Sequence, residues 1–297
     1  MKTFIRIVLA ALLASALTAH AALSIFATVP EWGALSQELG GDKVKVYVAT
    51  TALQDPHRIE ARPSLIARAR AADLVVATGA ELEVGWLPLV LQQTGKSASG
   101  PGYFEATANV PLLDKPAKLD RSEGDVHPFG DPHIQTDARN IGKVATALAQ
   151  RMSELDKANA AFYQQRLQDF QSRWSAAVAK WEQQAAPLKG QPIVVQHKGF
   201  TYLAHWLGLR EIAALEPKPG IEPTTAHLAE VLSLLQKQPA KMVLRAAYQG
   251  DQSSQWLAQR TKINVVTLPF TVGGTPGAKD LFGLFDDTID RLLKGAQ

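Results

Sequence analysis

One long segment, residues 157–186, reads KANAAFYQQRLQDFQSRWSAAVAKWEQQAA and contains neither glycine nor proline. Asp156 can cap its start, and Pro187 and Gly190 mark its end. Apolar side chains recur along it at roughly helical spacing: Phe162, Leu167, Phe170, Trp174, Val178 and Trp181. A helix of this length would reach about 45 Å at ~1.5 Å per residue, more than one small α/β unit needs. The segment therefore predicts a rigid strut between two parts of the chain, with its aromatic residues packed in a core.

On both sides of this strut, short apolar strands alternate with amphipathic helices. Before it we expect strands at 23–29, 43–49 and 73–79, and helices at 31–39, 63–72, 81–93 and 138–155. After it we expect strands at 192–196, 210–215, 241–247 and 263–268, and helices at 200–207, 225–237, 252–261 and 279–294. Such alternation produces βαβ units with parallel strands. The predicted fold class is α/β: two α/β lobes with mostly parallel sheets, joined by one long rigid helix.

The chain begins with a basic start, an apolar run of moderate length and the site Ala19-His20-Ala21, which together predict a cleaved secretory signal at residues 1–21. The predicted domains are then an N-terminal lobe at 22–137, a helical segment at 138–186 that includes the strut, and a C-terminal lobe at 187–297. Each lobe is long enough for a hydrophobic core of its own. No later run approaches ~20 continuous apolar residues, so we expect no direct insertion into a membrane.

The composition limits the cellular compartments and the classes of partner that we expect. The sequence has no cysteine, which excludes a lipid anchor, a disulfide framework and a thiolate zinc site. Without Lys2 and Arg6, 29 basic residues stand against 28 acidic ones, a net charge of +1. No stripe of basic residues with interleaved aromatics is present, which argues against nucleic acid as a partner. We expect a monomer in the periplasm of a diderm bacterium.

Histidines occur in three segments that leave or approach regular structure. One segment runs Gly124-Asp-Val-His-Pro-Phe-Gly-Asp-Pro-His-Ile-Gln-Thr-Asp137 and contains His127 and His133. The others are Gln54-Asp-Pro-His57 and Val194-Val-Gln-His197. Open α/β sheets bind ligands at the carboxyl ends of their strands, where His57 and His197 are expected. Two facing lobes would bring such loops into one cleft, so the positions predict a metal site between the lobes.

A single loop histidine is more often a solvated side chain than a ligand, and the prediction depends on three of them in comparable positions. His127 can be read as a ligand, as a partner of a ligand or as part of a loop without a role in the site. Three imidazoles favour Zn²⁺ in a tetrahedral shell, although copper would bind at least as tightly. Asp55, Asp131 and Asp137 are candidates to accept the imidazole N–H groups. Asp131 and Asp137 can equally cap a turn and the following helix.

These motifs together resemble the ZnuA/TroA-type solute-binding proteins, which deliver zinc or manganese to ABC importers. The resemblance extends over the whole chain after the signal segment. The matching segments are Asp55-Pro-His57 with Arg62-Pro-Ser64 and residues 72–76; Asp131-Pro-His133 with Asp137; Gln196-His197 with Phe200-x-Tyr202 and Gly208-Leu209; Glu222-Pro223; and the long helix. Each tripeptide is weak alone, but the combination is specific.

The resemblance implies that His57, His133 and His197 bind Zn²⁺ as the transported ligand and that the partner is an ABC importer permease at the inner membrane. It leaves open whether a periplasmic metallochaperone loads the site. Members with histidine at the third position resemble zinc binders, whereas manganese binders tend to carry glutamate there. A manganese- or iron-binding importer component is the alternative in the same class.

The chain departs from the family pattern in two places, and the first concerns the fourth ligand. Many members place an aspartate in the loop after the last strand, where this chain has Val272. A water, His127 or an unpredicted carboxylate could fill the position, and Asp131 and Asp137 are further candidates. A short segment, Asp114–Gly130, replaces the long histidine-rich loop of some zinc-binding members.

The alternative from another class is a secreted zinc-dependent hydrolase, since three histidines and an open position also suit catalysis. No His-Glu-x-x-His or Gly-x-Ser-x-Gly motif supports it.

Overall fold

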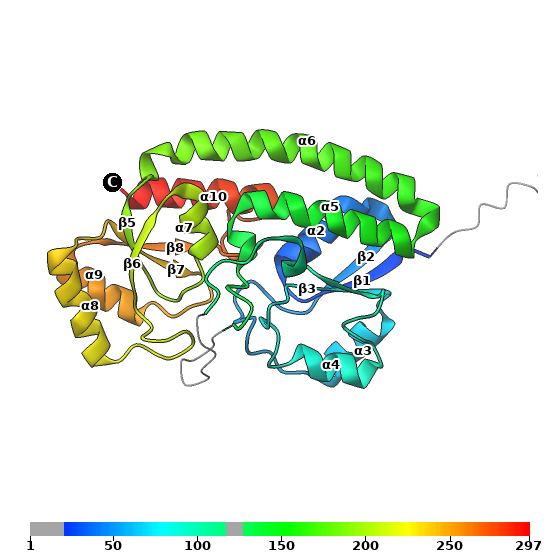
Figure 1. Cartoon of the computed structure of the whole chain (residues 1–297), viewed down its shortest axis with the longest axis horizontal. Helices are drawn as coiled ribbons and strands as arrows, with labels where there is room; N and C mark the ends of the chain where they lie inside the picture. Colours follow the sequence, from blue (N-terminus) through cyan, green and yellow to red (C-terminus); the bar gives the residue numbers. More distant parts are fainter. Residues whose placement is uncertain (1–20, 117–126) are drawn as a thin grey trace, which may run out of the picture.

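The computed structural model describes residues 21–116 and 127–297, so the predicted signal segment lies outside it except for Ala21. Two four-stranded parallel sheets form its two halves, in the orders β2-β1-β3-β4 and β6-β5-β7-β8 (Figure 1). The first sheet contains β1 (Leu23–Ala27), β2 (Val44–Val48), β3 (Leu74–Ala77) and β4 (Tyr103–Glu105). The second contains β5 (Pro192–Val195), β6 (Arg210–Ala214), β7 (Met242–Ala246) and β8 (Asn264–Leu268). The predicted fold class is confirmed.

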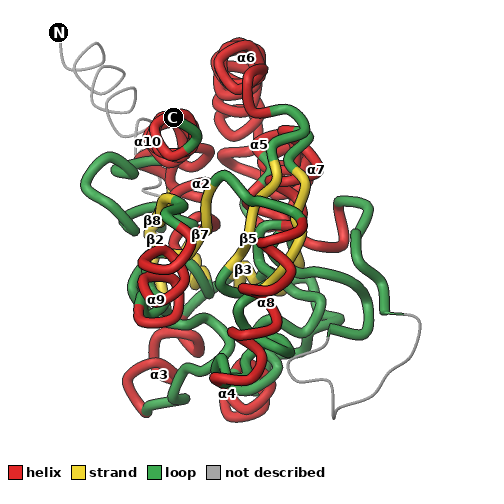
Figure 2. The backbone as a smooth tube through the Cα atoms, turned by 90° about the vertical axis from the view of Figure 1, so that its left-hand side faces the viewer, coloured by secondary structure: helices red, strands yellow, loops and turns green. Residues whose placement is uncertain are grey.

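Helices cover both faces of the two sheets, as Figure 2 shows from the side. They are α2 (Pro30–Gly40), α3 (Pro63–Ala71), α4 (Leu87–Thr94), α5 (Ala138–Leu155), α6 (Ala160–Ala185), α7 (Thr201–Leu207), α8 (Thr225–Lys237), α9 (Gln252–Thr261) and α10 (Leu281–Gly295). In each sheet, the first strand along the chain, β1 or β5, pairs with the next strand (β2 or β6) on one side and with the following one (β3 or β7) on the other. This change of direction opens a crevice at the carboxyl ends of β1 and β5.

The helix α6 crosses above both sheets and fixes their relative position (Figure 1). Its aromatic residues face α5 and α10. Trp174 lies 5.1 Å from Phe170 between ring centroids, and its indole N–H donates to the carbonyl of Ala138 at 2.8 Å. Trp181 packs against Phe285 of α10 at 5.1 Å between ring centroids. The aromatic series of the strut is thus packed in a core, as its spacing predicts.

The hydrophobic core differs from the separate cores that we expect for two lobes. One continuous cluster of buried side chains includes Ile25 of β1, Trp174 of α6, Ile193 of β5 and Phe285 of α10. Each half adds a smaller cluster beneath its outer helices. The reason is that α2 packs on the first sheet and α10 on the second, while α6 packs against both of these helices and against α5. The two halves therefore share most of their core.

One predicted helix begins later than expected, and one strand was missed. Residues 81–86 form turns, and α4 starts at Leu87 with Pro88 in its first turn. The buried carboxylate of Glu83 accepts the N–H groups of Thr78 and Gly79 at 2.8 and 3.1 Å, which bends the chain back on β3. β4 has only three residues, too few for a recognisable alternation. Within residues 21–116 and 127–297, no helix combines the length and the apolar character needed to cross a bilayer.

Candidate metal centre

The structure brings together three histidines that are far apart in the sequence. His57 lies in the loop after β2, His133 directly precedes the short 3-10 turn Ile134–Thr136 and α5, and His197 follows β5 by two residues. The ring centroids of His57 and His133 are 5.4 Å apart, those of His133 and His197 5.6 Å, and those of His57 and His197 5.9 Å. One ligand atom from each ring lies within 4.8 Å of the other two. This geometry can hold one metal ion.

The rings of His57 and His133 are oriented by the same local arrangement, an aspartate two residues earlier in the chain. In Asp55-Pro-His57, the Asp55 Oδ1 atom accepts the backbone N–H of His57 at 3.0 Å and contacts its Nδ1 at 2.8 Å. In Asp131-Pro-His133, the Asp131 Oδ1 atom makes the same two contacts at 2.8 and 2.7 Å. An aspartate in a turn commonly bonds the backbone two residues later, and the intervening proline fixes φ. Each Asp-Pro-His segment thus orients its own imidazole.

The third ring is oriented from a distance. His197 Nδ1 lies 2.7 Å from Oε2 of Glu216, which follows β6. The same Glu216 oxygen accepts the backbone N–H of Gly220 at 2.7 Å. The sequence analysis missed Glu216. The available signal was its position in Glu-Pro-Lys-Pro-Gly220, directly after a strand that pairs with β5, so that both loops leave the same end of the sheet.

The histidine nitrogens therefore divide into two groups. All three Nδ1 atoms contact carboxylates, whereas Nε2 of His57 and of His133 is buried without a hydrogen-bond partner among the described residues. A buried polar atom without a partner is unfavourable, and such atoms are uncommon in native proteins. A carboxylate on one imidazole nitrogen and a metal ion on the other is a recurring arrangement in metal sites. The donor set fits a cation that prefers nitrogen ligands.

Burial and neighbouring charges set the protonation of the site. Burial lowers the pKa of His133, and the charge of Asp131 only partly offsets it. Burial also acts to lower the pKa of His197, but the hydrogen bond and charge of Glu216 outweigh it and raise that pKa. The pKa of Asp55 and of Asp131 is lowered, because contacts with the neighbouring imidazoles outweigh the opposing effect of burial. The carboxylates are thus held in the ionised form that accepts an imidazole N–H.

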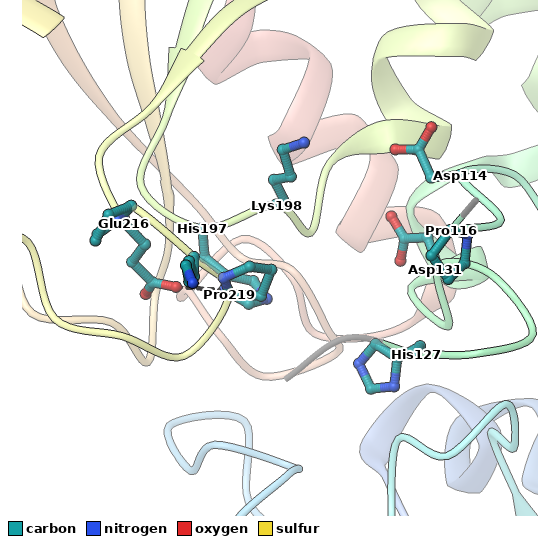
Figure 3. A pocket seen from close by; sticks show the side chains of 10 residues that line it. Asp114, Pro116, His127, Asp131, His197, Lys198, Glu216 and Pro219 are labelled. Carbon is teal, nitrogen blue, oxygen red and sulfur yellow. Dashed lines mark hydrogen bonds and ion pairs between the residues drawn. The ribbon is translucent and has the colours of Figure 1, made fainter. Parts of the chain in front are cut away.

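His127 lies beside the three clustered histidines. Its ring centroid is 5.4 Å from that of His57 and 6.3 Å from that of His133. Figure 3 shows it below a cavity that has His197 and Glu216 on one side and Asp131 on the other. Burial, reinforced by the neighbouring imidazoles, lowers the pKa of His127 to about 3, so its ring is neutral and able to bind a cation.

The remaining candidates take other positions. Asp137 caps α5 by accepting the backbone N–H of Arg139 at 2.9 Å and pairs with the guanidinium of that residue at 2.7 Å, the capping arrangement that the sequence leaves open. Val272 is partly buried and packs against the main core. In the same loop, the ring of Phe270 lies 5.4 Å from that of His133. The Phe270 ring therefore lies against one side of the histidine cluster.

Two parallel α/β halves, a long connecting helix and a histidine cluster at the carboxyl ends of the strands define a two-lobed solute-binding protein. The model of the family described as "Zinc-uptake complex component A periplasmic" matches residues 25–295, and the chain belongs to this family. It is a family of extracytoplasmic metal-binding components of ABC importers, not of enzymes, so the hydrolase alternative is set aside.

Known relatives bind different metals. The chain is 25% identical over 234 residues to the zinc-binding lipoprotein AdcA of Streptococcus pneumoniae, covering 75% of this chain and 44% of that protein. It thus spans less than half the length of AdcA. It is 20% identical over 281 residues to the manganese ABC transporter substrate-binding lipoprotein PsaA of Streptococcus mitis, covering 92% of this chain and 89% of PsaA.

Solved structures share the fold across nearly the whole chain. The crystal structure of ZnuA matches with a TM-score of 0.78 at 22% identity and covers 93% of this chain and 100% of that one. The solute-binding protein FpvC of Pseudomonas aeruginosa, in complex with Mn²⁺, matches with a TM-score of 0.76 at 21% identity and covers 92% of this chain and 99% of that one. At these identities the likeness defines the fold and leaves the choice between zinc and manganese to the site itself.

Proposed function

We propose that this protein captures Zn²⁺ in the periplasm through His57, His133 and His197 and delivers it to the permease of an ABC importer. The observation that carries the proposal is the division of the imidazole nitrogens. Each Nδ1 contacts a carboxylate, and one ligand atom of each ring lies within 4.8 Å of the other two. Neutral imidazoles bound through Nε2 and supported in this way suit zinc.

Zinc is favoured over manganese by the ligand type. The cluster that the described residues form consists of imidazoles alone, whereas Mn²⁺ prefers more oxygen donors. His127 is the proposed fourth ligand, because its neutral ring lies beside that of His57. A water molecule is the alternative occupant of that position. Competition between Zn²⁺ and Mn²⁺ under a calibrated chelator measures the preference, and a higher affinity for manganese would refute the choice of zinc.

The cellular setting of the proposal depends on the sequence. Residues 1–21 have the pattern of a cleaved signal, and the chain has no cysteine to carry a lipid. We therefore place the mature protein free in the periplasm. We also retain the domain division at residues 137/138 and 186/187 as part of the proposal. N-terminal sequencing of the protein from periplasmic extract tests the cleavage after Ala21. Recovery of an intact Met1 terminus would contradict it.

Triple substitution of His57, His133 and His197 by alanine is expected to abolish the stabilisation of the fold by zinc. Ligand binding to the native state raises its stability by about 2.7 kcal/mol at a hundredfold excess over Kd, so the wild type should show a clear rise in Tm. A matched control is His205→Ala, since His205 is exposed on α7. Differential scanning fluorimetry with and without Zn²⁺ measures the effect. A triple variant that zinc still stabilises like the wild type would overturn the assignment.

A further inference from the structure

The loop 216–223 separates two cavities that both reach the histidine cluster. A cavity of about 380 Å³ is lined by His127, His197, Glu216 and Pro219 (Figure 3). A second cavity of about 560 Å³ is lined by His57, His197, Glu216 and Gly220, among others. His197 and Glu216 are common to both. The position of this loop therefore decides how the cluster is exposed on either side.

A single oxygen of Glu216 connects this loop to the metal centre. Oε2 contacts Nδ1 of His197 and the backbone N–H of Gly220, each at 2.7 Å. Gly220 has a φ of +74°, in the left-handed region that residues with a Cβ rarely adopt. The contact thus closes a tight turn between Glu216 and Gly220. The side chain that orients His197 also sets the conformation of the loop.

The turn continues to the other lobe. The carbonyl of Gly220 accepts a hydrogen bond from the guanidinium of Arg58 at 3.1 Å. Arg58 directly follows His57, which belongs to the same cluster. A chain of contacts therefore runs from His197 through Glu216 and Gly220 to the residue beside His57. It joins the two lobes across the candidate metal centre.

We infer that Glu216 couples the occupancy of the metal centre to the conformation of the loop 216–223 and to its contact with Arg58; this rests on the proposed function. An imidazole that binds a metal through Nε2 must carry its proton on Nδ1. His197 then donates to Glu216 at all times, and a hydrogen bond to a carboxylate is stronger than one between neutral groups. Without the ion, the contact with Glu216 alone holds this edge of the ring, so the ring and the loop that Glu216 holds are restrained less. The loop is expected to be ordered by the bound ion and looser without it.

Hydrogen–deuterium exchange of the peptide covering residues 216–223, with and without Zn²⁺, tests this coupling. In the wild type, zinc is expected to slow exchange of the Gly220 amide at least tenfold. In Glu216→Ala, exchange stays fast even when zinc saturates the protein, and zinc affinity falls about 10- to 100-fold, as for other residues that hold a metal-binding imidazole. Glu216→Gln keeps an oxygen that accepts both N–H groups, so it is expected to restore the protection by zinc.

Arg58→Ala distinguishes the role of the contact between the lobes from that of Glu216. It removes the contact to the other lobe but leaves the contacts of Glu216 with His197 and Gly220 in place. Zinc affinity should stay within about threefold of the wild type, while the zinc-dependent protection of the Ile221 and Glu222 amides is reduced. A merely structural role of Glu216 would instead leave zinc affinity unchanged and the loop equally exposed with and without zinc. That result, or equal exchange in the wild type with and without bound zinc, overturns the coupling. A wild type that binds no zinc refutes the proposed function itself.

Discussion

Two halves of the candidate metal centre are built in different ways. On one side, His57 and His133 are each held by an aspartate two residues earlier, within an Asp-Pro-His segment. On the other side, His197 is held by Glu216, nineteen residues away, in a loop that reaches it only once β5 and β6 have paired. The first half depends on local chain geometry, and the second depends on the sheet. The comparison predicts that the two halves respond differently to substitution and to pH.

Removing Asp131 should give the largest effect, because its side chain orients a fully buried ring. Asp131→Ala is expected to weaken zinc binding about 10- to 100-fold. Asp55→Ala should lie at the lower end of this range, since the Asp55 side chain is 39% exposed against 6% for Asp131 and water can replace it. Competition titration against a chelator measures both. Asp131→Asn, which keeps the Oδ1 acceptor, is the control for folding, and an equal or larger loss in Asp55→Ala would contradict the comparison.

The pH dependence of zinc binding should identify His197 as the first ligand to be lost. Its raised pKa means that it takes up a proton at higher pH than the buried His133, whose pKa is lowered. Zinc must displace that proton, so affinity should fall by up to about tenfold for each pH unit below the pKa of His197. In Glu216→Gln, that pKa falls, and the decline should begin at lower pH, although affinity at pH 7.5 is weaker.

Glu222→Gln is the matched control, because Glu222 is exposed and lines the same cavity as Glu216. Its pH profile should coincide with that of the wild type. If Glu216→Gln and the wild type lose zinc over the same pH range, the long-range contact does not govern His197 and this part of the comparison fails.

The smallest effect is expected for His127, which has neither kind of support in the described residues. His127→Ala should weaken zinc binding about three- to tenfold, because water can take the fourth position of a tetrahedral zinc ion. Cobalt substitution gives the sharper measurement. The visible spectrum of the Co²⁺ form should change in His127→Ala if an imidazole nitrogen is replaced by water. An unchanged spectrum would exclude His127 as a ligand.

The same contrast explains what could be predicted from the sequence of the site. Asp55 and Asp131 stand next to their histidines in sequence, and both are predicted as acceptors of an imidazole N–H. Glu216 stands in a different loop, and no periodicity or spacing relates it to His197. Only the pairing of β5 and β6 brings the two together. Sequence patterns thus reveal contacts made within a turn and miss those created by the sheet.

The predictions of the fold show the same difference between local patterns and long-range contacts. Long periodic segments are predicted well: α8 and α9 begin and end where the sequence indicates, and α6 differs by three residues at its start. The predicted helix at 81–93 is wrong in its first six residues, because a side-chain carboxylate of Glu83 captures the backbone there. The shared core was also missed. Periodicity identifies the buried face of a helix but does not say that the face of α6 packs against helices of both halves.

The shared core also restricts how far the two halves can separate. Swinging the halves apart would carry rings such as Trp174, Trp181 and Phe285 into water. Each would lose about 4 kcal/mol or more, from ~150 Å² or more of apolar surface at ~25 cal/mol per Å². A hinge motion that separates the two halves is therefore far too unfavourable to occur each time an ion binds or leaves. Under the proposed function, release of the ion then depends on local hydrogen bonds, such as those of Glu216 with His197 and Gly220, and not on separation of the two halves.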